Sequence, residues 1–472
     1  MRYICDIMLA YRKISIMYSV TKYHITMNRY PALFEYCTIM SERSKSLRNA
    51  ALFRVRQWFT AYGKDYVQPN QQEVIDEVHL TMKLSGRKKP GKVISYYFMD
   101  RLMRCTGNPD YFNGLPSQAA QWVLKGVSFD FKGWLKALEA YYQDPTNFTG
   151  KPEMPRYCKR DLHSFTITNQ ECRIYSREDG SRYLHFPKTK ETLDVHVPED
   201  AALKEVKVIP YYGDFLISVT FDNGKTVPER NAMFMAGIDL GVDNTAAIVI
   251  NDGKKPVLYK GGALKAMNQF YNRNRAKYIG ILMKGHNPKD VSLNTKMLAS
   301  LSKNRAFFMN DDLHKISCHI VRECVKRNVG TIVIGKNTHW KTKAGMSKKS
   351  NQEFVQIPHC TLIHMIRYKA EREGIRVLVQ EESYTSKASF LDRDDIPVYD
   401  KENPAEYRFS GRRITRGLYR SENGTVISSD INGSANILRK AFPEAFEGMD
   451  VSYLQKVKTI KFFNLHSCRP KN

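Results

Sequence analysis

The chain has 472 residues, a formal net charge of +26 and 42% hydrophobic residues. This length predicts roughly two to four domains with substantial cores. The excess of 74 Lys and Arg over 48 Asp and Glu is spread along the chain, which indicates a polyanionic partner, with nucleic acid as the first candidate. Nine cysteines without CxxC spacing argue against a disulfide framework and a zinc ribbon. No apolar run approaches the ~18 residues of a membrane span, and the N-terminal segment lacks signal-peptide features, so we expect no membrane association.

The first third of the sequence changes from a strand pattern to a helical one. Residues 18–27 alternate and are rich in β-branched side chains, which predicts a strand. Apolar residues then recur near 3.6 spacing as far as residue 142, and a Thr, Asn, Gly and Pro-rich stretch follows at 146–156. We therefore expect an N-terminal extension with a first barrel strand in 1–29 and a helical recognition domain in 30–150.

The next segment has a period of two. Six short strand-like runs separated by turn residues lie between about 160 and 231, a pattern typical of a small barrel. We assign 151–232 to a β-barrel wedge domain. The strand at 18–27 is expected to close the same barrel, so that the helical block is inserted into it.

From residue 233 the pattern is that of an α/β domain. A strand hairpin at 234–250 leads through a basic helical region to a fully apolar strand at 331–335, which is typical of a central strand. A helix and a strand follow up to residue 382, then a polar insertion at 383–429, and finally a last helix with a basic tail at 430–472. The predicted fold is multi-domain α+β: a barrel with an inserted helical domain, then an α/β domain with a C-terminal insertion. Asp239 in the first strand of this α/β domain and Asp430 at the start of its last helix indicate the RuvC (RNase H-like) type of a nuclease.

Two aspartates carry the main chemical signal. Asp239 lies in an otherwise apolar strand, where a charge costs several kcal/mol to bury unless it is paired or bound to metal. Asp430 opens an amphipathic helix far downstream. RuvC-type nucleases use such acids to hold two Mg²⁺ ions for phosphodiester hydrolysis, and Mg²⁺ prefers oxygen ligands. We predict Asp239 and Asp430 as catalytic metal ligands, with Asn432 and Asn436 as supporting or substrate contacts.

A third acid is needed, and its usual place at the end of strand 331–335 holds Gly335, Lys336 and Asn337 instead. The next strand ends in Gln380, Glu381 and Glu382. Because the carboxyl ends of neighbouring parallel strands line one crevice, an acid on the adjacent strand can reach the same metals. We predict Glu382 as the third catalytic ligand, with Glu381 as the second candidate.

These motifs resemble those of TnpB, the RNA-guided nuclease of insertion-sequence transposons, related to Fanzor proteins and compact type V CRISPR effectors. Ala236–Gly241 resembles its first RuvC motif and Ser428–Ile437 its third, while Glu382 before Thr385 and Ser386 resembles a Fanzor-like branch with a relocated catalytic Glu. The resemblance implies an Mg²⁺-dependent DNA endonuclease (Mn²⁺ being an acceptable substitute) that binds a guide RNA from its own element and double-stranded target DNA next to a short motif. It also implies a cytoplasmic protein that acts at a prokaryotic nucleoid, and we favour a monomer.

The insertion departs from the family pattern, because the four cysteines that usually bind zinc are absent from 383–429. We therefore predict no zinc. Arginines interleaved with aromatic residues in this insertion suit contact with a single strand. The predicted nucleic-acid contacts are Arg43, Arg48, Arg54 and Arg56; Lys265, Asn268, Tyr271, Asn272 and Arg273; Arg408, Arg412, Arg413, Arg416, Tyr419 and Arg420; and Asn432.

Two other functions stay open on the sequence. The missing usual Glu is compatible with a nuclease-dead, RNA-guided DNA-binding repressor, although the retained Asp239 and Asp430 oppose it. A DDE-type transposase or a resolvase on the same fold is the second alternative, and the helical insert ahead of the nuclease domain opposes it.

Overall fold

The computed structural model describes residues 16–230, 232–336, 356–399 and 406–461. The chain divides into two compact units, one of residues 16–225 and one that contains the chain from residue 226 onward. Parts of the predicted N-terminal extension (1–15) and of the basic tail (462–472) lie outside the described residues. No described helix combines the length and the apolar character needed to cross a bilayer.

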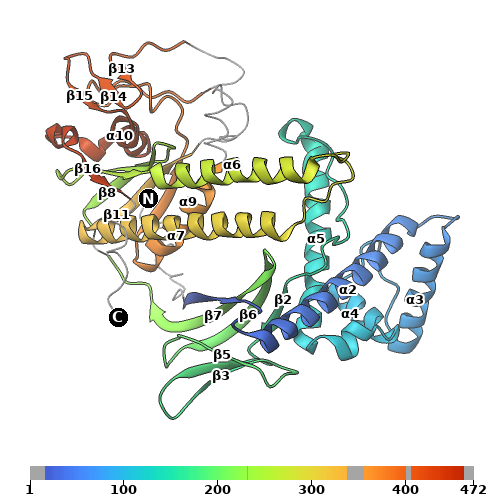
Figure 1. Ribbon diagram of the computed structural model, residues 1–472. Coiled ribbons are helices and arrows are strands. Elements are labelled where there is room, and N and C mark those ends of the chain that lie inside the picture. The colour runs from blue at the N-terminus through green and yellow to red at the C-terminus, as the bar shows by residue number, and fades with distance from the viewer. Residues whose placement is uncertain (1–15, 231, 337–355, 400–405, 462–472) are drawn as a thin grey trace, which may run out of the picture. The chain divides into compact units, whose positions relative to one another are not determined.

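The helices of the first unit lie between its first and second strands in sequence (Figure 1). Prolines start α2 and α3, where a missing N–H costs nothing, and Gly86 ends α3 with a left-handed φ of 65°. Their apolar faces form one core with the strands of the same unit. The helices are α2 (Pro31–Ala61), α3 (Pro69–Ser85), α4 (Tyr96–Cys105) and α5 (Ser117–Gln143).

The strands of the first unit form two open sheets. A four-stranded sheet has the order β1-β7-β6-β2, and a three-stranded sheet has the order β3-β4-β5. The first strand therefore does join the later ones, as predicted. The prediction of a closed barrel is wrong for the described residues, because no ladder joins edge strands β1 and β2 to the second sheet. The strands are β1 (Ile16–Ile25), β2 (Phe165–Thr168), β3 (Arg173–Ser176), β4 (Arg182–His185), β5 (Thr192–Asp194), β6 (Ala202–Tyr211) and β7 (Asp214–Thr226).

The second unit is built on a six-stranded mixed sheet of order β12-β11-β8-β9-β10-β16. β8, β11 and β12 run parallel, whereas β9 pairs antiparallel with both β8 and β10. The predicted hairpin, apolar strand and following strand are all present. The strands are β8 (Phe234–Asp239), β9 (Asn244–Ile250), β10 (Val257–Lys260), β11 (Val329–Gly335), β12 (Arg376–Gln380) and β16 (Lys458–Ile460).

Helices cover both faces of this sheet (Figure 1). Alternate strand residues point to opposite sides: Ile248 packs in the core with α7 and α9, while Val249 packs in the core with α10. Gly237 lets α10 approach β8 closely, since a methyl carbon there would lie 2.3 Å from the main-chain oxygen of Ser434. The helices are α6 (Gly262–Met283), α7 (Lys296–Lys326), α9 (His359–Arg372) and α10 (Ser429–Ala441).

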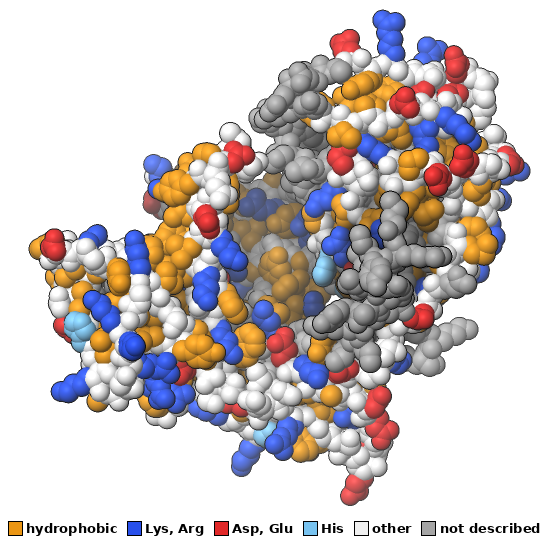
Figure 2. Space-filling model, turned by 180° about the vertical axis from the view of Figure 1, so that it is seen from behind, with side chains coloured by type: hydrophobic (Ala, Val, Ile, Leu, Met, Phe, Trp, Pro, Cys, Tyr) orange, Lys and Arg blue, Asp and Glu red, His pale blue; other side chains and the backbone are white. Residues whose placement is uncertain are grey.

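The predicted insertion between β12 and α10 ends in a small antiparallel sheet of order β13-β14-β15. Its strands are β13 (Arg412–Thr415), β14 (Leu418–Arg420) and β15 (Val426–Ser428). Figure 2 shows Lys and Arg side chains scattered over one face of the molecule among hydrophobic and acidic ones, without a single basic patch. On this face the positive side chains are therefore dispersed, which agrees with their spread along the sequence.

Candidate active site

Two acidic side chains, Asp239 and Glu382, come from the same edge of the six-stranded sheet. Asp239 is the last residue of β8, and the register pairs its neighbour Ile238 with Ile334 on β11. Gly335, the next residue, pairs with Gln380 at the end of β12, two residues before Glu382. The carboxyl ends of these parallel strands thus meet at one edge, as such ends do in α/β sheets.

The helix α10 adds the third acid. It packs on β8 and β9, and Asp430 lies in its first turn. Gly433, one turn later, faces the end of β8 so closely that a methyl carbon there would lie 2.7 Å from Oδ2 of Asp239. Gly335 faces the other acid, with the equivalent distance to Oε2 of Glu382 being 2.5 Å. Two glycines therefore leave room for two of the carboxylates.

Two of the carboxylates act electrostatically on the third, Asp239. Burial, and then the negative charges of Glu382 and Asp430, hold the pKa of Asp239 well above its usual range, while the positive charge of Arg413 opposes them. Burial, and then the neighbouring charge of Glu381, raise the pKa of Glu382 to about 7, against the effect of Lys440. Such repulsion between acids is typical of functional sites rather than of structural ion pairs.

Glu381 and Glu382 have different surroundings. Glu381 forms an ion pair of 2.7 Å with Nζ of Lys440 and accepts a hydrogen bond of 2.6 Å from the main-chain N–H of Ser383. Burial alone would raise its pKa, but these hydrogen bonds outweigh burial and lower it. Glu381 therefore stays ionised and paired with Lys440, and Glu382 is the one of the two whose charge acts on Asp239.

Asn244, the first residue of β9, also belongs to the acid cluster, although the sequence analysis did not predict it. Its Nδ2 donates a hydrogen bond of 2.5 Å to Oδ2 of Asp430. This bond fixes one face of the Asp430 carboxylate. The signal in the sequence was weak, because an Asn after a Gly turn is an ordinary hairpin residue.

The donor chemistry of the cluster suits a hard divalent cation, because carboxylate oxygens are its preferred ligands and a cation would relieve their repulsion. Among the residues that the structure describes, however, no three His, Cys, Asp or Glu side chains are grouped tightly enough to hold one ion. The acids thus lie within electrostatic range of one another without forming a completed coordination shell.

The structure corrects the prediction for Asn432, which is fully buried and cannot contact nucleic acid. Its Oδ1 accepts a hydrogen bond of 2.9 Å from the main-chain N–H of Phe390, and its Nδ2 donates one of 2.8 Å to the oxygen of Ala388. Asn436, one turn later and also fully buried, donates to the main-chain oxygens of Ala388 and Thr385 at 2.8 and 2.9 Å. These two asparagines fasten the start of the insertion to α10.

Hydrogen bonds to two aspartates, Asp392 and Asp394, hold the insertion together. Asp394 accepts hydrogen bonds from the main-chain N–H groups of Ser389 and Ser410 at 2.7 and 3.1 Å. Asp392 accepts one from the hydroxyl of Ser389 at 2.5 Å and one from the main-chain N–H of Glu422 at 2.9 Å. The predicted contact Tyr419 is also corrected: it is 1% exposed, and its hydroxyl donates to the main-chain oxygen of Lys387.

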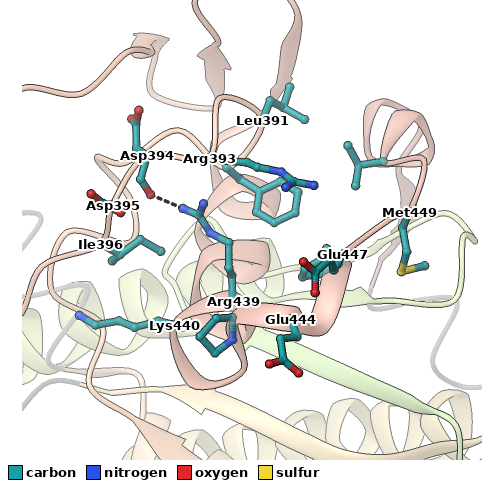
Figure 3. Close-up of a pocket in the computed structure, with 14 residues that line it drawn as sticks. Leu391, Arg393, Asp394, Asp395, Ile396, Arg439, Lys440, Glu444, Glu447 and Met449 are labelled. Carbon is teal, nitrogen blue, oxygen red and sulfur yellow. Dashed lines mark hydrogen bonds between the residues drawn. The ribbon is translucent and has the colours of Figure 1, made fainter.

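A pocket of about 440 Å³ lies beside this network, between the insertion and the C-terminal half of α10 (Figure 3). Arg439 points across it, and its Nη2 donates a hydrogen bond of 2.5 Å to the main-chain oxygen of Asp394. Acidic, basic and apolar side chains share the lining, which includes none of Asp239, Glu382 and Asp430. The pocket is thus distinct from the acid cluster.

The remaining predicted contacts of the insertion are exposed. Arg408, Arg412, Arg413, Arg416 and Arg420 all lie at the surface. The Nε of Arg416 forms an ion pair of 2.8 Å with Asp243, in the turn after β8, and Arg413 is close enough to influence the pKa of Asp239. The insertion therefore brings positive charge to the acid cluster.

The predicted contacts on α6 are mixed. Lys265 pairs with Asp243 at 2.7 Å, and Arg273 is exposed. Asn272 exchanges two hydrogen bonds of 3.0 Å with Gln356, and the Arg305 guanidinium lies 5.1 Å from the ring of Tyr271. Asn268 corrects the prediction, because it is 2% exposed and its Oδ1 accepts a hydrogen bond from Arg305.

The four arginines predicted on the early helix are half-buried in α2 and engaged within the first unit. Arg43 and Arg56 donate to the main-chain oxygens of Gly114 and Pro155 at 2.8 and 3.0 Å. Arg48 and Arg54 form ion pairs of 2.8 and 2.5 Å with Asp130 and Glu77. In this conformation all four stabilise the helical region.

Two family models match the chain. A model described as a probable transposase, OrfB of the IS605 type, matches residues 217–341, and one described as a Cas12f1-like TNB domain matches residues 359–437. A TnpB-like protein of Acidianus two-tailed virus is 24% identical over 276 residues. That match covers 57% of this chain and 54% of the viral protein, so the chain spans about half the length of this curated relative.

Solved structures agree with this assignment at the level of fold. A Cas12f1–sgRNA–target DNA complex matches with a TM-score of 0.53 and 13% identity, over 87% of this chain and 84% of that one. A CRISPR-Cas12f ternary complex, 12% identical over 86% of this chain and 82% of that one, has a TM-score of only 0.31, too low to indicate a shared fold. From the two family models, the viral relative and the Cas12f1 fold together, the chain is a TnpB-type relative of the compact type V effectors.

Proposed function

We propose that this protein is an RNA-guided DNA endonuclease that cleaves by two-metal RuvC chemistry. The observation that carries the proposal is the acid cluster, in which Asp239, Asp430 and Glu382 come from two strand ends and a helix start. Within it the charges of Glu382 and Asp430 disfavour the ionisation of Asp239. An arrangement that raises the pKa of Asp239 so far is costly for the fold, and a bound cation is the simplest compensation.

In this proposal Asp239, Glu382 and Asp430 hold two Mg²⁺ ions, or Mn²⁺ in their place. Ions held by these residues would supply water activation and stabilisation of the leaving oxygen in phosphodiester hydrolysis. Residues of the chain itself position these ligands. Asn244 orients Asp430 through a hydrogen bond, while Lys440 forms an ion pair with Glu381 and leaves Glu382 to face the cluster. Arg413 is suited to contact the phosphate next to the scissile bond, since it already acts on Asp239.

We propose a guide RNA and a double-stranded target DNA as partners, with the protein reading a short motif beside the target. The Cas12f1 structure of similar fold is a complex with an sgRNA and target DNA. The charge of +26 and the exposed arginines of the insertion support a polyanionic partner. In effectors of this kind base pairing reads the sequence and the protein reads the duplex geometry.

The test is to purify the protein from cells that carry its native flanking DNA and to sequence the RNA bound to it. The complex is then incubated with a matched plasmid whose target is flanked by randomised bases, in Mg²⁺ or in EDTA. The proposal expects Mg²⁺-dependent cuts next to one flanking motif, lost in Asp239→Ala and Glu382→Ala. Guide-dependent binding without cleavage in Mg²⁺ or Mn²⁺ would contradict the nuclease and support an RNA-guided DNA binder.

A further inference from the structure

Gly335 ends the central strand β11 at a place where its backbone does not require glycine. Its φ is not in the left-handed region, unlike that of Gly374, whose φ is +70°. A glycine inside a strand weakens the strand, and it often marks a place where another group approaches closely. The reason for Gly335 must therefore lie in its surroundings.

Two side chains fill the space that a side chain at 335 would need. A methyl carbon there would lie 2.5 Å from Oε2 of Glu382 and 2.5 Å from Cδ1 of Ile437, which projects from α10. At Gly237, by contrast, the obstacle is the backbone of α10. The two nearest atoms are the ends of flexible side chains, and Cγ1 of Ile437 follows at 3.1 Å. A substitution would therefore displace these side chains more readily than it would open the fold.

We propose that Gly335 is a positioning residue for the acid cluster: the missing side chain at the end of β11 is what lets the Glu382 carboxylate, reaching over from the end of β12, lie beside Asp239. A side chain at 335 and the Glu382 carboxylate compete for one space. An acid placed after β12 therefore requires a glycine at the end of β11. The inference rests on the proposed function, since it treats Glu382 as a metal ligand.

The test measures Mn²⁺ binding to the full-length protein by electron paramagnetic resonance, together with the unfolding temperature and guided plasmid cleavage. Gly335→Ala is expected to weaken Mn²⁺ binding and cleavage about 10- to 100-fold, the usual effect of disturbing a group that orients a metal ligand. Its unfolding temperature should stay close to that of the wild type. Gly280→Ala, on α6 with nothing within 4 Å of the added carbon, is the matched control and should bind and cleave normally.

Ile437→Val separates the two neighbours of Gly335, because it removes the Cδ1 atom. Gly335→Ala combined with Ile437→Val should remain impaired, since Glu382 is still displaced. Recovery of Mn²⁺ binding in this double variant would overturn the proposal, because Ile437 would then be the cause. Normal Mn²⁺ binding by Gly335→Ala would overturn it too.

Glu382→Gln tells a failure of this inference apart from a failure of the proposed function. If Glu382→Gln binds Mn²⁺ as tightly as the wild type does, Glu382 is not a ligand, and the proposed metal site and the role of Gly335 both fail. If Glu382→Gln is impaired while Gly335→Ala is normal, only the role of Gly335 fails. Impairment of both variants, with Gly280→Ala normal, is the expected result.

Discussion

Asn432→Ala tests most directly whether this residue stabilises the insertion instead of contacting nucleic acid. Its side chain forms hydrogen bonds with the main chain of Phe390 and Ala388. The substitution leaves the main-chain N–H of Phe390 buried without its acceptor, which costs about 1–3 kcal/mol. It also removes the bond to Ala388, worth about 1 kcal/mol, although Asn436 still donates to that oxygen. The expected loss in the free energy of unfolding is therefore roughly 2–4 kcal/mol.

Differential scanning calorimetry measures this loss, and the unfolding temperature of the affected unit should fall by roughly 5–15 °C, given about 2–4 °C per kcal/mol for a unit of this size. Hydrogen exchange followed by mass spectrometry should show faster exchange at residues 385–390. Asn287→Ala, at an exposed position, is the control and should change stability by less than about 0.5 kcal/mol. Normal stability of Asn432→Ala with weakened DNA binding would refute the reasoning and restore the original prediction.

Three further predictions concern residues outside the cluster of Asp239, Glu382 and Asp430. Burial raises the pKa of Asp312 from 3.8 to about 7, so the folded state binds the Asp312 proton more tightly than the unfolded state does. The stability that this proton contributes is therefore lost as the pH rises from about 4 through 7. Asp312→Asn should flatten that decline in stability, and a stability–pH curve identical to that of the wild type would contradict the prediction. Arg327→Ala leaves Asp252, whose side chain is 1% exposed, without its ion-pair partner. Urea unfolding should show a loss of about 3–5 kcal/mol in the free energy of unfolding. A loss below about 1 kcal/mol would show that Asp252 finds another partner. A zinc chelator should leave the protease resistance of the insertion unchanged, since Asp392 and Asp394 hold it by hydrogen bonds, and faster cleavage would indicate a bound metal.

The order of elements and the two aspartates followed from the sequence because they depend on local pattern. Period-two and period-3.6 spacing placed the strands around Asp239 and the helix of Asp430, and apolar residues on both sides of an acid are visible without a structure. The parallel-strand rule also placed Glu382 near the same edge.

Only the tertiary structure decided which polar residues are buried and hydrogen-bonded within the fold and which stay at the surface. Asn432, Asn268 and Tyr419 have polar side chains in basic surroundings, yet all three are buried and bonded within the protein. The choice between Glu381 and Glu382 likewise depends on Lys440, which is distant in sequence. A barrel was expected from short alternating strands, but closure depends on pairing between edge strands, which the alternation of one strand does not encode. The sequence thus determines local conformation and the kinds of chemical groups present, whereas burial and the choice of partners arise only when distant segments pack together.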